Sequence, residues 1–203
     1  MHVAPEMART CIAALLLWEA VGCSTAPPSI SSAVSAAGAS SGPGDSSGAT
    51  GPWTDGTKLS GRVTIAAGST MTVAPGATIA IATGTTVTVV GTLAARSASP
   101  THAKLTGSGW NGIVVAGGGT LLFDGVDLVG ASTALDIQKG AKAEYDDGNI
   151  DASAMPFNVE AGGILTTQRS TVTRTQGGSQ VAGTFTAAHL DYNSGDNSGI
   201  MTT

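Results

Sequence analysis

The sequence is poor in cysteine, in aromatic residues and in charge. Of its 203 residues, 2 are cysteines, 4% are aromatic and 11% are charged. Cys11 lies in a segment that we expect to be removed, so only Cys23 would remain and an intramolecular disulfide is excluded. Lys and Arg number 9 against 14 Asp and Glu. This balance leaves no basic stripe for neutralising phosphates, and we expect no nucleic-acid partner.

The N-terminal region also lacks an apolar run of membrane-spanning length. The run from Cys11 to Trp18 is far shorter than the ~20 residues that a spanning helix needs. A basic residue, Arg9, precedes this run and small residues follow it. Residues 1–23 are therefore predicted to be a signal peptide that ends at Cys23.

The end of this segment, Ala-Val-Gly-Cys at residues 20–23, resembles a bacterial lipobox. In a lipobox the cysteine is diacylated and becomes the new N-terminus, so we expect lipid attachment at Cys23. Ser24 after the cysteine favours sorting to the outer membrane. Glu19 and Ala20 differ from the apolar residue and the leucine that are usual in a lipobox. The alternative is a secreted protein in which Cys23 is an unpaired thiol.

Residues 24–56 consist almost entirely of Ser, Ala, Gly, Pro and Thr. Such a segment buries too little apolar area to offset chain entropy, so it is predicted to be a flexible linker. The linker would join the anchor to a domain over residues 57–195. Residues 196–203 would then form a C-terminal tail.

Between residues 112 and 195 the chain repeats with a period of 22 residues. At each recurrence two residues that would face the core flank one that would face outward. This is the alternation of a β-strand. A fixed period with this alternation predicts a β-solenoid, in which each repeat buries its apolar side against the next. The recurring pairs are Ile113 and Val115, Leu135 and Ile137, Phe157 and Val159, and Ser179 and Val181.

Each repeat has room for three short strands, which gives a three-sided parallel coil. In the first 22-residue repeat the second strand carries Leu121 and Phe123, and the third carries Val126 and Leu128. The same pattern continues upstream with looser spacing, as in Val63 and Val87. The predicted fold class is all-β, a parallel β-solenoid of about six three-strand coils. Small inward residues, such as Gly148, predict a narrow or locally underfilled interior.

Two phrases carry a resemblance to a known group. They are SGRVTIAAGSTMTVAPGATIAIATGTTVTVVGTL, from Ser60 to Leu93, and the W-x-G-I phrase from Trp110 to Ile113. They resemble the right-handed parallel β-helix domains of bacterial extracytoplasmic proteins, the pectate-lyase-like superfamily, and are typical of its non-enzymatic surface lipoproteins. The resemblance covers roughly residues 57–195 and implies a right-handed parallel β-helix. It does not select a function, because this fold hosts lyases, hydrolases, adhesins and spacers.

One corner of the predicted coil is acidic. The period stacks Asp124 under Asp146, and Gly125 under Asp147 and then Arg169. Clustered carboxylates beside an arginine suit a lyase, since they offer oxygens for Ca²⁺ and a base for the proton next to a uronate carboxyl. A carboxylate pair also suits a glycoside hydrolase. Asp124, Asp146, Asp147 and Arg169 are therefore the candidate catalytic residues, with Ca²⁺ as the candidate cofactor.

A structural interpretation of this corner competes with the catalytic one. Turns attract Asp and Gly, and Asp147 paired with Arg169 would form an exposed ion pair of little energetic weight. The aromatic residues of the repeats are predicted to point inward, which leaves few rings for a sugar to stack on. No long loops build the walls of a cleft.

Other polar residues give weaker patterns. His102 and His189 lie far apart in the stack and have no cysteine partners, so we expect no metal site. An outward column on the third strand is most simply a hydrogen-bonding ladder between coils. The column consists of Asp127, Asn149, Thr171 and Asp191.

These patterns lead to one expectation of function and two alternatives. We expect a non-enzymatic, lipid-anchored β-helix protein of the bacterial cell envelope, at the outer membrane if lipidated and otherwise secreted. Its faces would form a structural or adhesive surface for an envelope glycan or a surface protein. The first alternative is a small polysaccharide lyase or glycoside hydrolase with its site at the acidic corner. The second is the start of a longer adhesin.

Overall fold

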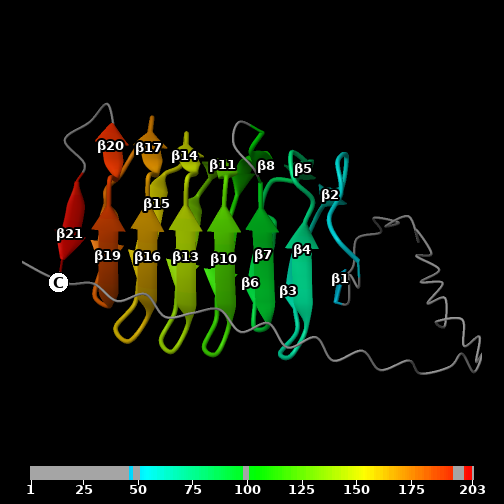
Figure 1. Ribbon diagram of the computed structural model, residues 1–203, viewed down its shortest axis with the longest axis horizontal. Coiled ribbons are helices and arrows are strands. Elements are labelled where there is room, and N and C mark those ends of the chain that lie inside the picture. The colour runs from blue at the N-terminus through cyan, green and yellow to red at the C-terminus, as the bar shows by residue number, and fades with distance from the viewer. Residues whose placement is uncertain (1–45, 48–50, 98–100, 194–198, 203) are drawn as a thin grey trace, which may run out of the picture. The chain divides into compact units, whose positions relative to one another are not determined.

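Three parallel sheets wind around one apolar core to form a β-solenoid (Figure 1). A computed structural model describes residues 46–47, 51–97, 101–193 and 199–202, which lie in one compact unit, residues 38–203. In each turn the chain passes through sheet A, then sheet B, then sheet C. The predicted all-β parallel solenoid of about six turns is confirmed. Within the described ranges, no helix is long and apolar enough to cross a membrane.

The strands are short, and most of them have four or five residues. Sheet A contains β1 (Ser46–Ser47), β3 (Arg62–Ile65), β6 (Thr86–Val89), β9 (Gly112–Val115), β12 (Thr133–Ile137), β15 (Met155–Val159), β18 (Ser179–Val181) and β21 (Ile200–Thr202). Sheet B contains β4 (Thr70–Val73), β7 (Thr92–Arg96), β10 (Thr120–Asp124), β13 (Lys142–Asp146), β16 (Ile164–Gln168) and β19 (Thr184–Ala188). Sheet C contains β2 (Lys58–Leu59), β5 (Thr78–Ile81), β8 (Ala103–Trp110), β11 (Val126–Ala131), β14 (Asn149–Asp151), β17 (Thr171–Thr173) and β20 (Asp191–Asn193).

The predicted register between turns is confirmed. Leu135 pairs with Ile113 on one side and with Phe157 on the other, so these side chains form one inward column. The outward residue that follows Leu135, Asp136, pairs with Val114 in the same way. Successive side chains of a strand point to opposite faces, and the 22-residue period therefore keeps every apolar column directed at the core.

The core is continuous along the solenoid, and its side chains are almost fully buried. Leu93, Leu121, Leu128, Leu135 and Leu165 are all 0% exposed. Because each turn lies on its neighbours, these residues gain burial only when adjacent turns are folded, which couples the turns to one another. The Phe157 and Phe185 rings pack with their centroids 5.8 Å apart and join two consecutive turns.

The core has no gap at the small residue Gly148, so the prediction of underfilling is wrong at this position. A Cβ atom at Gly148 would contact the carbonyl oxygen of Val126 and the hydroxyl of Tyr145. The Tyr145 ring occupies the space that glycine leaves, and its hydroxyl donates a hydrogen bond of 2.8 Å to the Val126 carbonyl. The large and the small residue thus compensate each other within one turn.

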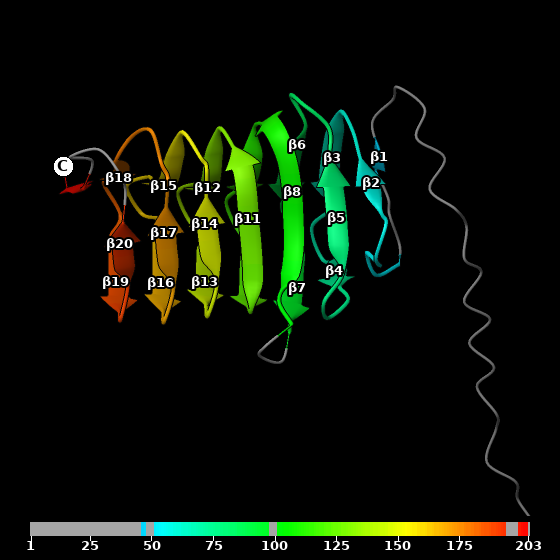
Figure 2. The same ribbon diagram turned by 90° about the horizontal axis from the view of Figure 1, so that it is seen from above.

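The stack begins before residue 57, where the predicted domain began. Strand β1 pairs with β3, so part of the segment predicted as a linker adds a strand to sheet A. Trp53 pairs with Val73 of β4, and its side chain is 3% exposed. Together with β2 on sheet C, these residues form a partial turn that covers the first complete one (Figure 2).

The last turn is covered less well than the others. Sheets B and C end at β19 and β20, whereas sheet A continues to β21 within the predicted tail. Phe185 and Tyr192 occupy the predicted inward columns but remain partly exposed, because the described residues contain no further strand of sheet B or sheet C that packs on them. On β21, Met201 is 57% exposed.

Candidate functional site

The acidic corner follows the C-terminal ends of the sheet B strands. Asp124 of β10 pairs with Arg96 of β7 on one side and with Asp146 of β13 on the other. Asp146 in turn pairs with Gln168 of β16. The predicted stacking of Asp124 and Asp146 is therefore confirmed. The column also contains Arg96, a cation that the sequence interpretation did not include.

The second column of the corner is a backbone turn. Gly125, Asp147 and Arg169 occupy equivalent places after their strands, with φ angles of 70°, 48° and 49°. This left-handed conformation suits glycine and is tolerated by aspartate. The backbone amides of Gly125 and Asp147 donate to the carbonyls of Asp146 and Gln168, at 3.0 and 2.9 Å. The residues here thus turn the chain from sheet B to sheet C.

The predicted ion pair between Asp147 and Arg169 is not present. The ion pairs found among the described residues are His102 with Asp127 and Arg174 with Asp151. Arg169 instead places Nη1 3.5 Å from Oε1 of Gln168, and its side chain is exposed. A guanidinium that is free in solvent does not hold a carboxylate in a fixed orientation.

The carboxyl of Asp146 has a perturbed acidity. Burial raises the pKa of its carboxyl above the usual value, and the charges of Asp124 and Glu144 add to this effect. A hydrogen bond from the Gln168 backbone and the charge of Arg169 act in the opposite direction. Its Oδ1 atom is buried and has no hydrogen-bond partner.

The corner does not assemble a metal site. In residues 51–97, 101–193 and 199–202, no group of three or more His, Cys, Asp or Glu side chains is arranged to hold a metal ion. Asp124 is exposed, and the strand spacing of about 4.8 Å separates it from Asp146 along the solenoid. The four candidate residues thus lie at one corner, but they do not converge on a shared point as Ca²⁺ ligands do.

Replacing Asp146 with Asn is expected to leave the protein equally or slightly more stable at pH 7. The pKa of Asp146 is higher in the folded chain than in the unfolded chain, so its ionised form disfavours folding above the folded-state pKa. The difference should disappear at about pH 3, below the unfolded-state pKa of about 3.9, where the carboxyl is protonated in both states. Melting temperatures of both proteins at the two pH values test this, with Asp124→Asn as the exposed control. A marked loss of stability at pH 7 would contradict it.

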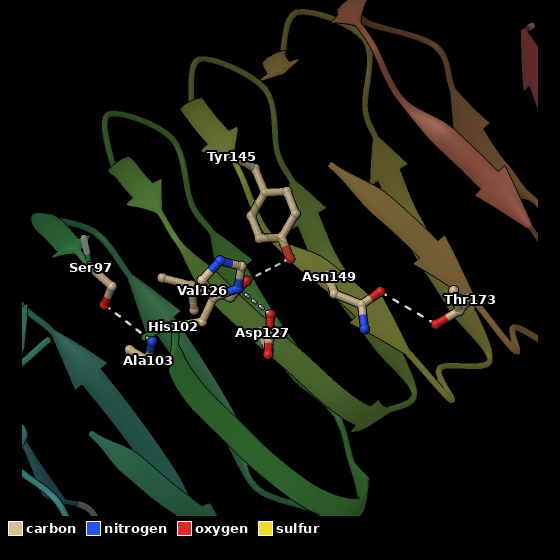
Figure 3. Close-up of polar contacts among 8 residues, drawn as sticks. All are labelled: Ser97, His102, Ala103, Val126, Asp127, Tyr145, Asn149 and Thr173. Carbon is tan, nitrogen blue, oxygen red and sulfur yellow. Dashed lines mark hydrogen bonds and ion pairs between the residues drawn. The ribbon is translucent and has the colours of Figure 1, made fainter. Parts of the chain in front are cut away.

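Sequence reasoning missed a contact on sheet C. Nδ1 of His102 lies 2.9 Å from Oδ1 of Asp127, and both side chains are partly exposed (Figure 3). The register pairs Ala103 with Val126, which brings the residue before β8 next to β11. The spacing along the chain between His102 and Asp127 could have indicated this contact. However, His102 lies in the longest corner loop, where the period of the repeat is irregular. The loop is held by Ser97, whose Oγ accepts a hydrogen bond of 3.1 Å from the Ala103 amide.

The outward column on sheet C keeps its predicted register, in which Asp127 pairs with Asn149 and Asn149 with Thr171. Its hydrogen bonds take other directions than the predicted ladder. Asp127 contacts His102, and Oδ1 of Asn149 accepts a bond of 3.3 Å from Oγ1 of Thr173 in the neighbouring column (Figure 3).

A second polar contact on this face has a structural role. Oδ1 of Asp151 accepts a bond of 2.9 Å from Oγ1 of Thr173 and one of 2.7 Å from Nε of Arg174. The hydrogen bond from Arg174 is the main cause that lowers the pKa of Asp151 below its usual value. Arg174 has a φ angle of 50°, so this contact fixes another left-handed corner.

The predicted lipid-attachment residue, Cys23, lies outside the described residues, as does the whole of the predicted signal peptide. Comparisons of the chain with protein-family models, with curated proteins and with solved structures found no match. The residues themselves therefore carry the functional argument.

Proposed function

We propose that this chain is a non-catalytic, lipid-anchored β-helix protein of a bacterial cell envelope, whose flat faces form a structural or adhesive surface. The anchor is diacylated Cys23, residues 1–23 are the signal peptide that ends at this cysteine, and the linker tethers the solenoid to the outer membrane. In this proposal the chain has the anchor and the fold of the right-handed β-helix surface lipoproteins that its sequence resembles. Its adhesive partner is an envelope glycan or a surface protein.

The observation that supports a scaffold is the uninterrupted stacking of the three sheets. Paired strands follow one another through six turns with one irregularity of register, between Val129 and Ala131 of β11. The outward positions hold mostly short polar residues, as in the Thr70, Thr92 and Thr120 column of sheet B. Sheets of this kind offer a broad contact surface. A hollow opens on sheet C, lined by Lys58, Ala80 and Thr106 among others, and no residue of the acidic corner lines it.

A polysaccharide lyase or glycoside hydrolase is the second candidate. The raised pKa of Asp146 beside the charge of Arg169 favours it, since a general base works best with a pKa moved toward the working pH. Against it stand the turn conformation of Asp147 and Arg169 and the absence of convergence at the corner.

The anchor and the scaffold are tested by one pair of experiments. The wild-type chain, expressed in a Gram-negative host, should be found in the membrane fraction, and Cys23→Ser should release it into the soluble fraction. A wild-type chain that is already soluble would overturn the anchor.

The purified chain, incubated with polygalacturonate and Ca²⁺, should release no unsaturated product. Release that is abolished by Asp146→Asn would replace the scaffold with the lyase.

A further inference from the structure

Charge is divided unequally along the solenoid. From residue 51 to residue 123 the only acidic residue is Asp55. The cations of this part are Lys58, Arg62, Arg96 and Lys104. From residue 124 to residue 193 the carboxylates outnumber the cations, and they are Asp124, Asp127, Asp136, Glu144, Asp146, Asp147, Asp151, Glu160 and Asp191 against Lys139, Lys142, Arg169 and Arg174. An acidic protein therefore has a basic first part.

The four cations of the first part gather on and beside sheet C. Lys58 of β2 and Lys104 of β8 are outward residues of this sheet. Arg96 ends β7 at the corner before sheet C, and Arg62 begins β3 just after the opposite corner. We call these four residues the basic patch. Figure 2 shows β2, β5 and β8 adjacent to one another at this end of the sheet.

The surface between the two lysines carries no charge, and part of it is an open hollow lined by Lys58, Ala80 and Thr106. Lys58 pairs with Ala80, and Ala80 pairs with Thr106, which lies on the same strand as Lys104. Two strand spacings of about 4.8 Å therefore separate Lys58 from β8. With only alanine and threonine between them, both ammonium groups can approach a flat partner together.

The basic patch is available for a partner. All four side chains are exposed, and none forms an ion pair or a side-chain hydrogen bond within the described residues. Asp55, the one carboxylate in residues 51–123, accepts a hydrogen bond of 2.8 Å from the Thr78 amide. Two carboxylates of the next turn lie beside the patch, since Asp124 pairs with Arg96 and Asp127 pairs with Lys104 in the strand register. Lys58 and Arg62 pair instead with the uncharged residues Ala80 and Thr86, so within the described residues the patch keeps an excess of four cations over these three carboxylates.

We infer that the basic patch docks the first turns of the solenoid on an anionic phospholipid membrane, with the acidic turns directed away from it. This inference rests on the lipid anchor proposed above, because the anchor precedes β2 along the chain. Along the chain the proposed anchor is therefore closer to the basic turns than to the acidic ones.

The size of the effect suits a tethered domain. A cation near an anionic bilayer contributes about 1 kcal/mol, so four of them give weak binding that becomes effective only at the high local concentration set by the anchor. Beyond a Debye length of about 8 Å the attraction is screened, so the patch must contact the surface. The carboxylates of the later turns are repelled by the same surface, which orients the solenoid.

Contact between the ends of two copies fits the charges less well. The last turn, residues 184–193, carries only His189 and Asp191 as titratable groups besides Tyr192. Most of the acidic residues lie in the turns between residues 124 and 160, on the sides of the solenoid. Charge complementarity between the two ends is therefore small, whereas the basic patch matches a broad anionic surface.

Vesicle binding tests the inference without the anchor. The Cys23→Ser chain should sediment with vesicles of phosphatidylglycerol and phosphatidylcholine at low ionic strength, and not with vesicles of phosphatidylcholine alone. Adding Lys58→Glu and Lys104→Glu should weaken this binding by about tenfold or more. The matched control adds Lys139→Glu and Lys142→Glu, which changes the net charge equally in the acidic part and should retain most of the affinity. Circular dichroism should give all three proteins similar melting temperatures.

Several results would overturn the docking, and they are distinct from failure of the anchor. These are no binding to the anionic vesicles, equal weakening by both pairs of substitutions, and binding to soluble polygalacturonate but not to vesicles. A salt-sensitive dimer in sedimentation that Lys58→Glu abolishes would assign the patch to a second copy. If fractionation shows no anchor while the vesicles still bind the Cys23→Ser chain, the proposed anchor fails and the basic patch remains.

Discussion

Replacing Gly112 with Ala should destabilise the protein by about 3 kcal/mol or more, through the combined cost of a backbone clash and a strained φ angle. Gly112 begins β9 with a φ angle of 112°, which L residues rarely adopt. A Cβ atom at this position would overlap the carbonyl oxygen of Thr133 in the next turn. Because the obstacle is backbone, no side-chain rotation can relieve it. Urea unfolding followed by far-UV circular dichroism measures the loss.

The control for this substitution is Gly118→Ala. Gly118 also has a positive φ angle, 84°, but open space surrounds the position of the added Cβ atom. Only the left-handed backbone is then penalised, at about 1–2 kcal/mol. Equal effects of the two substitutions would show that the close approach of turns at Gly112 has no energetic weight.

Replacing Leu135 with Ala should lower the free energy of unfolding by about 2–5 kcal/mol, the range for truncation of a fully buried leucine. Leu135 is 0% exposed and lies between Ile113 and Phe157 of the adjacent turns. The cavity would interrupt the core in the middle of the stack, where turns on both sides depend on the contact. The expected result is a lower urea midpoint, with broadening if the two halves of the solenoid unfold separately.

Val114→Ala is the matched control for Leu135→Ala. Val114 is the outward residue of β9, and it pairs with Asp136, the neighbour of Leu135. Its side chain is half-buried on the outer surface, so its truncation should change stability by about 0.5 kcal/mol. A loss as large as that of Leu135→Ala would contradict the assignment of inward and outward faces.

The repeat itself could be predicted because it is written in local spacing. Val115, Ile137 and Val159 recur every 22 residues, and parallel pairing places each over the last. The same reasoning located Asp124 and Asp146 in one column. Backbone hydrogen bonds between turns repeat at a fixed spacing. Residues that are one period apart in the sequence therefore occupy equivalent positions in successive turns.

The contacts of polar side chains could not be counted in the same way. Arg169 was expected to pair with Asp147, but both occupy a left-handed turn and Arg169 extends to Gln168 instead. His102 was considered only as a metal ligand together with His189, and its contact with Asp127 of the strand adjacent to β8 was not predicted. A long side chain has several rotamers and partners within reach, and the corner conformation selects among them.

The sequence by itself determines the strands, their register and which face of each strand points to the core. The reason is that an apolar alternation with a constant period can bury its apolar columns in only one arrangement. The folded chain settles where the stack begins, since Trp53 is buried only when Val73 and its neighbours are already in place. The tertiary structure also determines which charged side chains lie near one another. The basic patch exists only because the corners of the solenoid bring Arg62 and Arg96 to the same region as Lys58 and Lys104. The physical reason is that backbone pairing is periodic, whereas side-chain charges interact with whatever the three-dimensional fold places within a few ångströms.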